Sequence, residues 1–307
     1  MDLVKGPVRI INAREQKRVG RGKFFMFFSL ILFLFLGLSP SASLAQITAE
    51  DHIRSGMKHY AQGQLGEALN SFTNAIKTKP NLARAYTNRG LVKYLLGDIE
   101  GAFDDHNKAI ERDPKLAEAY TNRGGTKFAK GDYQGAIADH TKALELRPDM
   151  VQALNNRAMV RIHIRDVDGA LADLDKALQL NPFDPTAYTN RASAYLEKKD
   201  YEKAAMDSTK AIVLNPNLAS AYLLRARILQ EVKVLDKAME DLNKAIELDP
   251  KLAAAYMNRG TIKIAQKQYE AGLQDLYKGL ELVPNLEPTA RPWIEYASKA
   301  LEEKAKK

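Results

Sequence analysis

The chain has 307 residues, of which 45% are hydrophobic and 27% charged, and its lack of cysteine excludes disulfides, thiolate metal sites and a cysteine nucleophile. The formal net charge of +8 lies mostly in residues 1–45, which hold seven basic and two acidic side chains, whereas the remainder has 39 basic and 36 acidic ones. Since most of this excess lies in the N-terminus and the remainder is nearly balanced, the charge does not support a nucleic-acid partner, and we expect none.

The first 45 residues have the pattern of an export signal. Basic residues between Lys5 and Lys23 precede the apolar run 24–38, and the small residues Ser43 and Ala45 follow it. This order predicts a secretory signal peptide that is cleaved after Ala45, giving a periplasmic or secreted protein. The 15-residue apolar run is shorter than the roughly 20 residues of a spanning helix. The alternative is an uncleaved anchor, with membrane association through residues 24–38.

The rest of the chain is organised by prolines that recur every 34 residues. They are Pro80, Pro114, Pro148, Pro182, Pro216, Pro250 and Pro284. A fixed period of this length indicates a solenoid of stacked helix hairpins. We therefore divide residues 49–286 into seven repeats: 49–82, 83–116, 117–150, 151–184, 185–218, 219–252 and 253–286. Neither flank is long enough to bury a core of its own, so we expect no separate catalytic domain and no enzyme.

Within each repeat, large and small residues alternate at fixed positions. Position 4 is large, as in Tyr86 and Tyr120, and position 8 is small, as in Gly90 and Gly124. Alanine fills positions 20 and 27 in six repeats each. Two antiparallel helices approach closely only where small side chains meet. Each repeat is thus predicted to form two helices, the second ending near the proline.

On these residues the chain resembles the tetratricopeptide repeat family, whose pattern has an aromatic residue at position 4, small residues at positions 8, 20 and 27, and proline at position 32. The resemblance covers residues 49–286. It implies an all-α fold, an α-solenoid of seven helix-turn-helix repeats wound as a right-handed superhelix. Residues 287–307, with Trp293, Ile294 and Ala297 at amphipathic spacing, should form a C-terminal capping helix. We expect Trp293 to pack on the final hairpin.

The same resemblance implies a concave groove that is lined by positions 2, 5, 6, 9, 12 and 13 of each first helix. Position 6 is asparagine in five repeats, and position 5 is threonine or asparagine in several. The candidate peptide-binding residues are Asn88, Asn122, Asn156, Asn190, Asn258, Thr87, Thr121 and Asn155. Side-chain amides can match the C=O and N–H groups of an extended peptide, and related arrays hold peptide with such an asparagine ladder. The alternative is that asparagine is a tolerated exposed residue of the repeat, although it is a poor helix former.

Two other patterns favour structural roles. Position 7 is arginine and position 23 is aspartate in repeats two to seven, and the first repeat has Ser55 and Ser71 instead. This joint occurrence predicts Arg–Asp pairs between helices, within or between repeats, rather than an anion-binding ladder. His106 and His140 occupy position 24 in successive repeats. No third ligand has helical spacing to them, so we expect polar packing and no metal.

The leading hypothesis is a non-catalytic, exported scaffold or adaptor that binds an extended peptide or protein in its concave groove. The family's two-carboxylate clamp is not expected, because its slots hold Ile53, Met57 and Glu118, and only Asn88 matches. We find no catalytic residue and expect no cofactor. The alternative function is a membrane-tethered assembly factor that organises an envelope protein complex. A third interpretation makes the array the targeting arm of a separate catalytic subunit.

Overall fold

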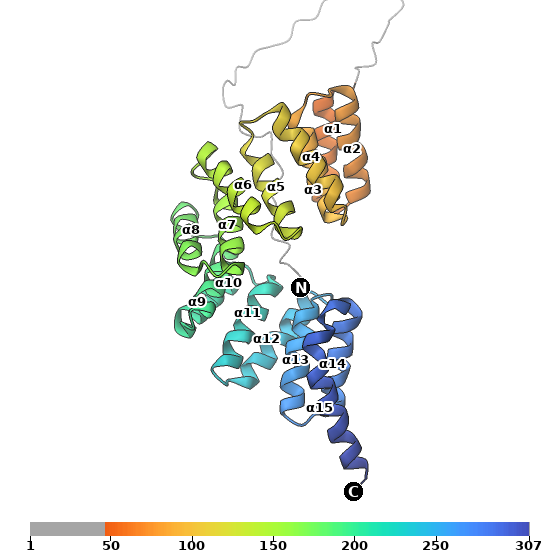
Figure 1. Ribbon diagram of the computed structural model, residues 1–307, viewed down its shortest axis with the longest axis vertical. Helices are drawn as coiled ribbons and strands as arrows, with labels where there is room; N and C mark the ends of the chain where they lie inside the picture. Colours follow the sequence, from red (N-terminus) through yellow and green to blue (C-terminus); the bar gives the residue numbers. More distant parts are fainter. Residues whose placement is uncertain (1–46, 307) are drawn as a thin grey trace, which may run out of the picture. The chain divides into compact units, whose positions relative to one another are not determined.

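The computed structural model describes residues 47–306, and the expected signal segment, residues 1–45, lies outside them. The described chain is helical apart from its connections (Figure 1). Its helices are α1 (Ala49–Ala61), α2 (Leu65–Thr78), α3 (Ala83–Leu95), α4 (Ile99–Arg112), α5 (Ala117–Ala129), α6 (Tyr133–Leu146), α7 (Val151–His163), α8 (Val167–Leu180), α9 (Pro185–Glu197), α10 (Tyr201–Leu214), α11 (Ala219–Glu231), α12 (Leu235–Leu248), α13 (Ala253–Ala265), α14 (Tyr269–Leu282) and α15 (Glu287–Ala305), with a short 3-10 turn at Pro284–Leu286. The predicted all-α fold of consecutive helix pairs is confirmed.

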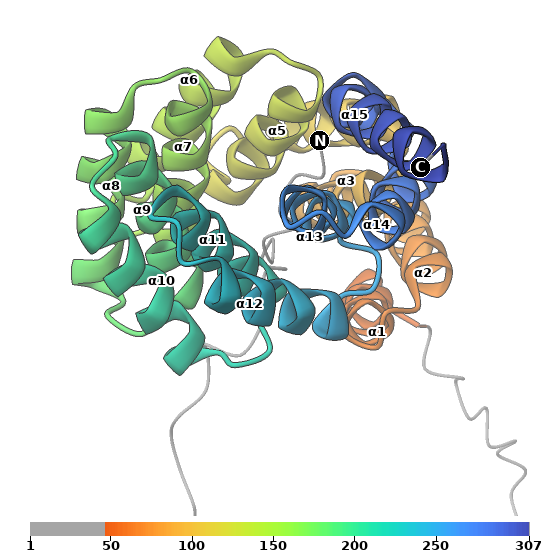
Figure 2. The same ribbon diagram turned by 90° about the horizontal axis from the view of Figure 1, so that it is seen from below.

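The described residues form two compact units, an N-terminal unit (47–126) and a C-terminal unit (127–306), with the boundary inside α5. In the N-terminal unit α1 packs on α2, α2 on α3, and α3 on α4. In the C-terminal unit each odd-numbered helix from α7 packs on the next even-numbered one, and α9 also contacts α7 and α11. Figure 2 shows α9, α11 and α13 on the inner side of this unit, with α8, α10 and α12 outside them. The hand of the predicted superhelix stays a prediction.

The turns inside the repeats combine a left-handed residue with a helix cap. At position 15 the first three repeats have glycine with φ between 74° and 87°, a conformation that glycine adopts without steric cost. The next residue is the N-cap of the second helix. Asp98, Asp132, Asp166 and Asp200 each accept a hydrogen bond there from the backbone N–H three residues on. This side-chain cap satisfies one of the free amides of the first turn.

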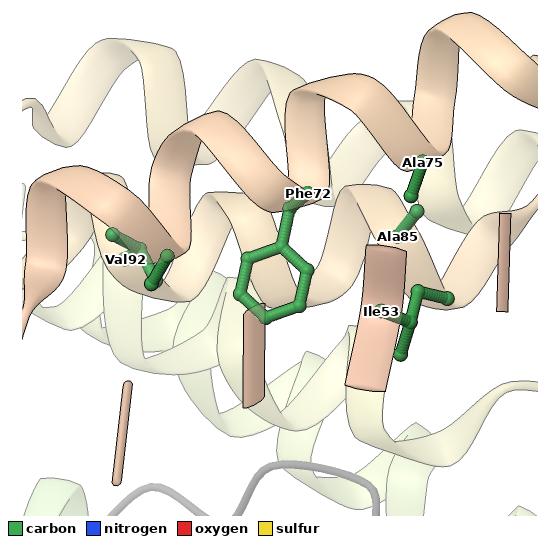
Figure 3. Close-up of a cluster of buried hydrophobic side chains, with 6 residues drawn as sticks. Ile53, Phe72, Ala75, Ala85 and Val92 are labelled. Atoms are coloured by element: carbon green, nitrogen blue, oxygen red, sulfur yellow. The ribbon is translucent and has the colours of Figure 1, made fainter. Parts of the chain in front are cut away.

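The core is built from small side chains that let the helices approach. Every alanine at positions 20 and 27 is fully buried: Ala68, Ala102, Ala136, Ala170, Ala204 and Ala238, then Ala75, Ala109, Ala143, Ala177, Ala211 and Ala245. In the N-terminal unit, Phe72 of α2 lies between Ile53 of α1 and Val92 of α3 (Figure 3). A Cβ atom on Gly56 would lie 2.6 Å from the Phe72 ring, so only glycine fits opposite it. Each hairpin therefore completes its core with the next helix, as a solenoid requires.

The last helix closes the C-terminal unit, but one prediction about it is wrong. Ala290, Ile294 and Ala297 of α15 pack against Leu276 of α14 and Ile264 of α13, as a capping helix should. Trp293 does not join this cluster, and 38% of its surface is exposed. The reason is geometric: Ala290, Ile294 and Ala297 form an i, i+4, i+7 stripe, which turns residue 293 to its edge. Within residues 47–306 no helix has both the length and the apolar character for a membrane crossing.

Candidate functional site

Arg–Asp pairs fix the rotation of the odd-numbered helices. Arg157 of α7 donates through Nε and Nη2 to the carboxylate of Asp173 on α8, at 2.9 and 2.6 Å. Its Nη1 reaches back to Thr141 Oγ1 of α6, at 3.0 Å. The bidentate bond recurs at Arg89, Arg191, Arg225 and Arg259 with the aspartate 16 residues later. The predicted pairing is thus confirmed for these five arginines, and each of them also ties its repeat to the one before.

The carboxylate of the Arg89–Asp105 pair is buried and ionised. Asp105 is 1% exposed and accepts from Arg89 and, at 2.8 Å, from Lys93 Nζ. Burial opposes ionisation of this carboxyl, but the hydrogen bonds from Arg89 and Lys93 outweigh it and lower the pKa of Asp105. These arginines are therefore occupied by structural partners rather than presented to an anionic ligand.

The pairs also decide which side of each odd-numbered helix turns away from its even-numbered partner. Positions 7 and 11 point to the aspartate of the even-numbered helix, as Arg157 and Arg161 do toward Asp173. Positions 2, 5, 6 and 9 form an i, i+3, i+4, i+7 stripe on the opposite side of the helix. We call the stripes of neighbouring odd-numbered helices the amide face. The eight candidate residues from the sequence all lie on it, at positions 5 and 6.

In the N-terminal unit the amide face has two asparagines with unused hydrogen-bonding groups. Asn88 of α3 is 1% exposed, and neither its Nδ2 nor its Oδ1 has a partner. Asn122 of α5 is 8% exposed, and its side chain forms no hydrogen bond with the described part of the chain. The neighbouring threonines differ, because Thr87 and Thr121 donate to the carbonyls of Ala83 and Ala117 in their own helices. Their hydroxyl protons are already used.

In the C-terminal unit the candidate residues fall into two groups. Asn156 of α7 and Asn190 of α9 are half-buried, and neither amide hydrogen-bonds within residues 47–306. Asn155 donates through Nδ2 to Asp184 at 2.8 Å, and Asn258 donates to the Ala254 carbonyl at 2.7 Å. The Oδ1 of Asn155 is buried and lacks a partner. At position 6, four consecutive repeats therefore contain asparagines with free amides: Asn88, Asn122, Asn156 and Asn190.

The two predicted packing histidines are buried within the helix layers. His106 and His140 are each 1% exposed, and His106 Nδ1 lies 3.2 Å from Thr126 Oγ1. Burial lowers the pKa of His140 to about 4, so this ring is neutral at pH 7. In the described residues no group of three His, Cys, Asp or Glu side chains is placed to hold a metal ion. These histidines therefore fill the core.

Family models of the tetratricopeptide repeat match residues 56–97, 83–116, 117–150, 164–219 and 219–252. The chain belongs to the tetratricopeptide repeat family. Proteins with this repeat are typically non-catalytic scaffolds for protein–protein interaction, and none of the matching models describes an enzyme. No curated protein matches the chain.

Solved structures share the fold at low sequence identity. A tetratricopeptide repeat protein from Parabacteroides merdae is 22% identical with a TM-score of 0.66, over 81% of this chain and 98% of that one. Yeast Tom70 is 21% identical with a TM-score of 0.59, over 84% of this chain and 54% of its own. PilF of Pseudomonas aeruginosa is 20% identical with a TM-score of 0.56, over 67% of this chain and 94% of its own. At these identities the likeness establishes the solenoid fold alone.

Sequence reasoning missed two features of the amide face. Asp184 both accepts from Asn155 and caps α9 through the Thr186 N–H, at 2.8 and 2.9 Å. This contact joins residues 29 apart, and no periodicity signals it. The other missed residue is Arg227, an exposed cation at position 9 of α11. Reading the position 9 residues of successive repeats could have found it, because the next repeats on either side have Ser193 and Thr261 there.

Proposed function

We propose that the chain is a scaffold that binds an extended peptide segment of a protein partner on its amide face, in the groove of the solenoid. The observation that carries this proposal is the set of free side-chain amides at position 6 in four consecutive repeats. They lie in two pairs, Asn88 and Asn122 in the N-terminal unit, and Asn156 and Asn190 in the C-terminal unit. Each pair is a binding element of its own.

The energetics favour a ligand at these amides. A buried polar group without a partner costs about 1–3 kcal/mol, and native proteins leave few such groups. Asn88 has two of them in one side chain. Asparagine also costs helix stability at each of these interior positions. An extended peptide offers alternating C=O and N–H groups that satisfy both atoms of an amide, which gives binding tolerant of peptide sequence.

The test uses peptides of known sequence. Nonapeptides would be selected from a random display library with the wild-type protein, then measured by fluorescence anisotropy. We expect Asn156→Ala with Asn190→Ala, or Asn88→Ala with Asn122→Ala, to weaken binding about tenfold or more, since each lost hydrogen bond contributes roughly 1 kcal/mol. The matched control is Asn70→Ala with Asn74→Ala, two exposed asparagines on α2.

Backbone recognition gives a second readout. Peptides that are N-methylated at single positions lose one donor without changing a side chain, so they should bind wild type more weakly at the positions that contact asparagine. If the selected peptides bind both double variants as tightly as wild type, the amide face is not the binding site. Binding that tolerates N-methylation at every position would likewise contradict the proposal.

We also propose that the protein is exported, on the sequence of residues 1–45. The alternative, a membrane-tethered assembly factor, requires residues 24–38 to be retained in the mature protein. N-terminal sequencing of the protein from membrane and soluble envelope fractions separates the two. A mature N-terminus at Gln46 supports export with cleavage, whereas a membrane-bound product that keeps residues 24–38 supports the tether.

A further inference from the structure

One charged residue interrupts an otherwise uncharged amide face in the C-terminal unit. On α7, α9, α11 and α13, positions 2, 5, 6 and 9 are occupied by sixteen residues, and fifteen of them are uncharged. The exception is Arg227. In the N-terminal unit, by contrast, both arginines at these positions have an acidic partner: Arg84 pairs with Glu50 at 3.5 Å, and Arg54 pairs with Asp51 at 3.3 Å.

Arg227 has no acidic partner in the described part of the chain. It is exposed and forms no ion pair there. Glu231, one turn further along α11, is exposed and not paired with it. The order Arg then Glu at i, i+4 is also the weaker orientation for a helix ion pair. Asp184 is already engaged by Asn155 and by the first turn of α9.

The helix that presents Arg227 also departs from the asparagine pattern. Position 6 of α11 is Leu224, which is 5% exposed, and position 5 is Leu223, where α7 and α9 have asparagine and threonine. Leucine cannot hydrogen-bond a peptide backbone, whereas an apolar surface beside a guanidinium selects among ligand side chains. This repeat is therefore suited to recognise a side chain or a chain end, whereas Asn190 of the preceding repeat has an amide available for a peptide backbone.

Covering Arg227 with a ligand has a clear energetic consequence. In the free protein the guanidinium is solvated, but a peptide on the amide face would remove part of that water. A desolvated charge is costly unless it is paired, and a carboxylate pairs with arginine through two parallel hydrogen bonds. A neutral peptide would bear the desolvation cost without this compensation. An anionic group at α11 would therefore be favoured over a neutral one.

We propose that Arg227 binds a carboxylate of the extended peptide, next to an apolar residue that contacts the part-exposed Leu223. This inference rests on the proposed peptide-binding function and names the class of ligand. The carboxylate comes from an aspartate or glutamate side chain or from the C-terminus of the peptide. The residues involved differ from the family's lysine and asparagine clamp, whose slots do not match here.

The test uses two synthetic pools of nonapeptides, one ending in a free carboxylate and one in an amide. Each pool is divided into peptides with Asp or Glu and peptides with Asn or Gln at the same positions. We expect wild type to bind the acidic members at least tenfold more tightly, the effect of a charge-assisted hydrogen bond. A preference that persists in the amidated pool identifies a side-chain carboxylate. A preference that appears only with free ends identifies the C-terminus.

Variants then assign the preference to one residue. Arg227→Gln should abolish the discrimination, because acidic peptides lose their charged partner and neutral peptides no longer bear the cost of desolvating a cation. Arg227→Glu should reverse the preference in favour of lysine and arginine peptides. Lys237→Gln, which removes an exposed cation of the same repeat from α12, is the matched control. Circular dichroism melts check that each variant folds.

The outcomes separate this inference from the function on which it rests. Binding that depends on Asn156 and Asn190 but shows no acidic preference, or an acidic preference unchanged in Arg227→Gln, overturns the role of Arg227 alone. Acidic selectivity lost in Arg227→Gln but kept in Lys237→Gln supports it. If neither pool contains peptides that bind, both the function and the role of Arg227 are wrong.

Discussion

The Arg–Asp pairs allow a matched comparison of two arginines that differ in one respect. Arg157 and Arg225 each hold a buried aspartate through two hydrogen bonds, and each contacts a threonine of the preceding repeat. Asp173, the partner of Arg157, has a second cation, because Arg161 Nη1 lies 2.8 Å from it. Asp241, the partner of Arg225, has no second cation within residues 47–306, since residue 229 is leucine.

We expect Arg225→Leu to destabilise the protein more than Arg157→Leu does. The Asp241 side chain is 8% exposed, so the first variant leaves a buried carboxylate unpaired, which costs about 3–5 kcal/mol. Arg157→Leu leaves Asp173 paired with Arg161, so the loss should be about 1–2 kcal/mol, the scale of hydrogen bonds to a charged group. Leucine keeps helix propensity at both sites.

The assay is urea unfolding at pH 7, followed by far-UV circular dichroism, with the slope of the transition checked for constancy. As a second arm, Arg225→Leu with Asp241→Leu should recover much of the lost stability, because no charge remains buried. Equal losses in Arg157→Leu and Arg225→Leu, or no recovery in the double variant, would refute the argument that an unpaired carboxylate dominates the cost.

Three further predictions come from comparing repeats. In the turn before α12, Lys233 has a φ of 64°, and the side chain of Val234 forms no helix-capping hydrogen bond. The second and third repeats have glycine followed by aspartate at these two positions. Lys233→Gly and Val234→Asp should therefore each raise the unfolding free energy by about 1 kcal/mol in the same urea titration. Gly90→Ala should lower it by about 1–3 kcal/mol, because the added Cβ lies 2.6 Å from His106 Nε2. The buried ring of His140 has a pKa of about 4 in the folded protein, against 6.5 in the unfolded chain. As the pH is lowered, the unfolded chain therefore takes up the proton first, and the unfolding free energy falls by about 3 kcal/mol from pH 6.5 to pH 4. His140→Leu should flatten that part of the pH profile.

The helix pairs were predictable because their determinants repeat. A close approach between helices needs small side chains at fixed positions, and twelve alanines at positions 20 and 27 record that need in the sequence. The Arg–Asp pairs were predictable for the same reason, since both partners recur together and are absent together from the first repeat. What the sequence did not indicate is the second contact of each arginine, because position 25 varies between threonine, asparagine and aspartate.

The packing of α15 was predicted only in part. An amphipathic spacing identifies a helix with an apolar side, but several stripes of three residues can be drawn through the same segment. The seventh repeat, on which α15 packs, determines which stripe is buried. The buried stripe is that of Ala290, Ile294 and Ala297, because small residues allow close contact with Leu276. Trp293 is too large for that seam, and it remains at the edge.

The candidate site shows why a repeated residue is not a repeated function. Asn155 and Asn156 are neighbours in the sequence, yet the Asn155 amide donates to Asp184 and the Asn156 amide donates to nothing in residues 47–306. Asn258 shares position 6 with Asn156, but its amide turns back onto its own helix. Periodicity places a side chain on a face, whereas its partners decide whether its hydrogen bonds remain available. Because binding to a peptide backbone needs free amides, the proposed function predicts that loss of binding follows the pair Asn88 and Asn122 of one unit and the pair Asn156 and Asn190 of the other, rather than all eight candidates.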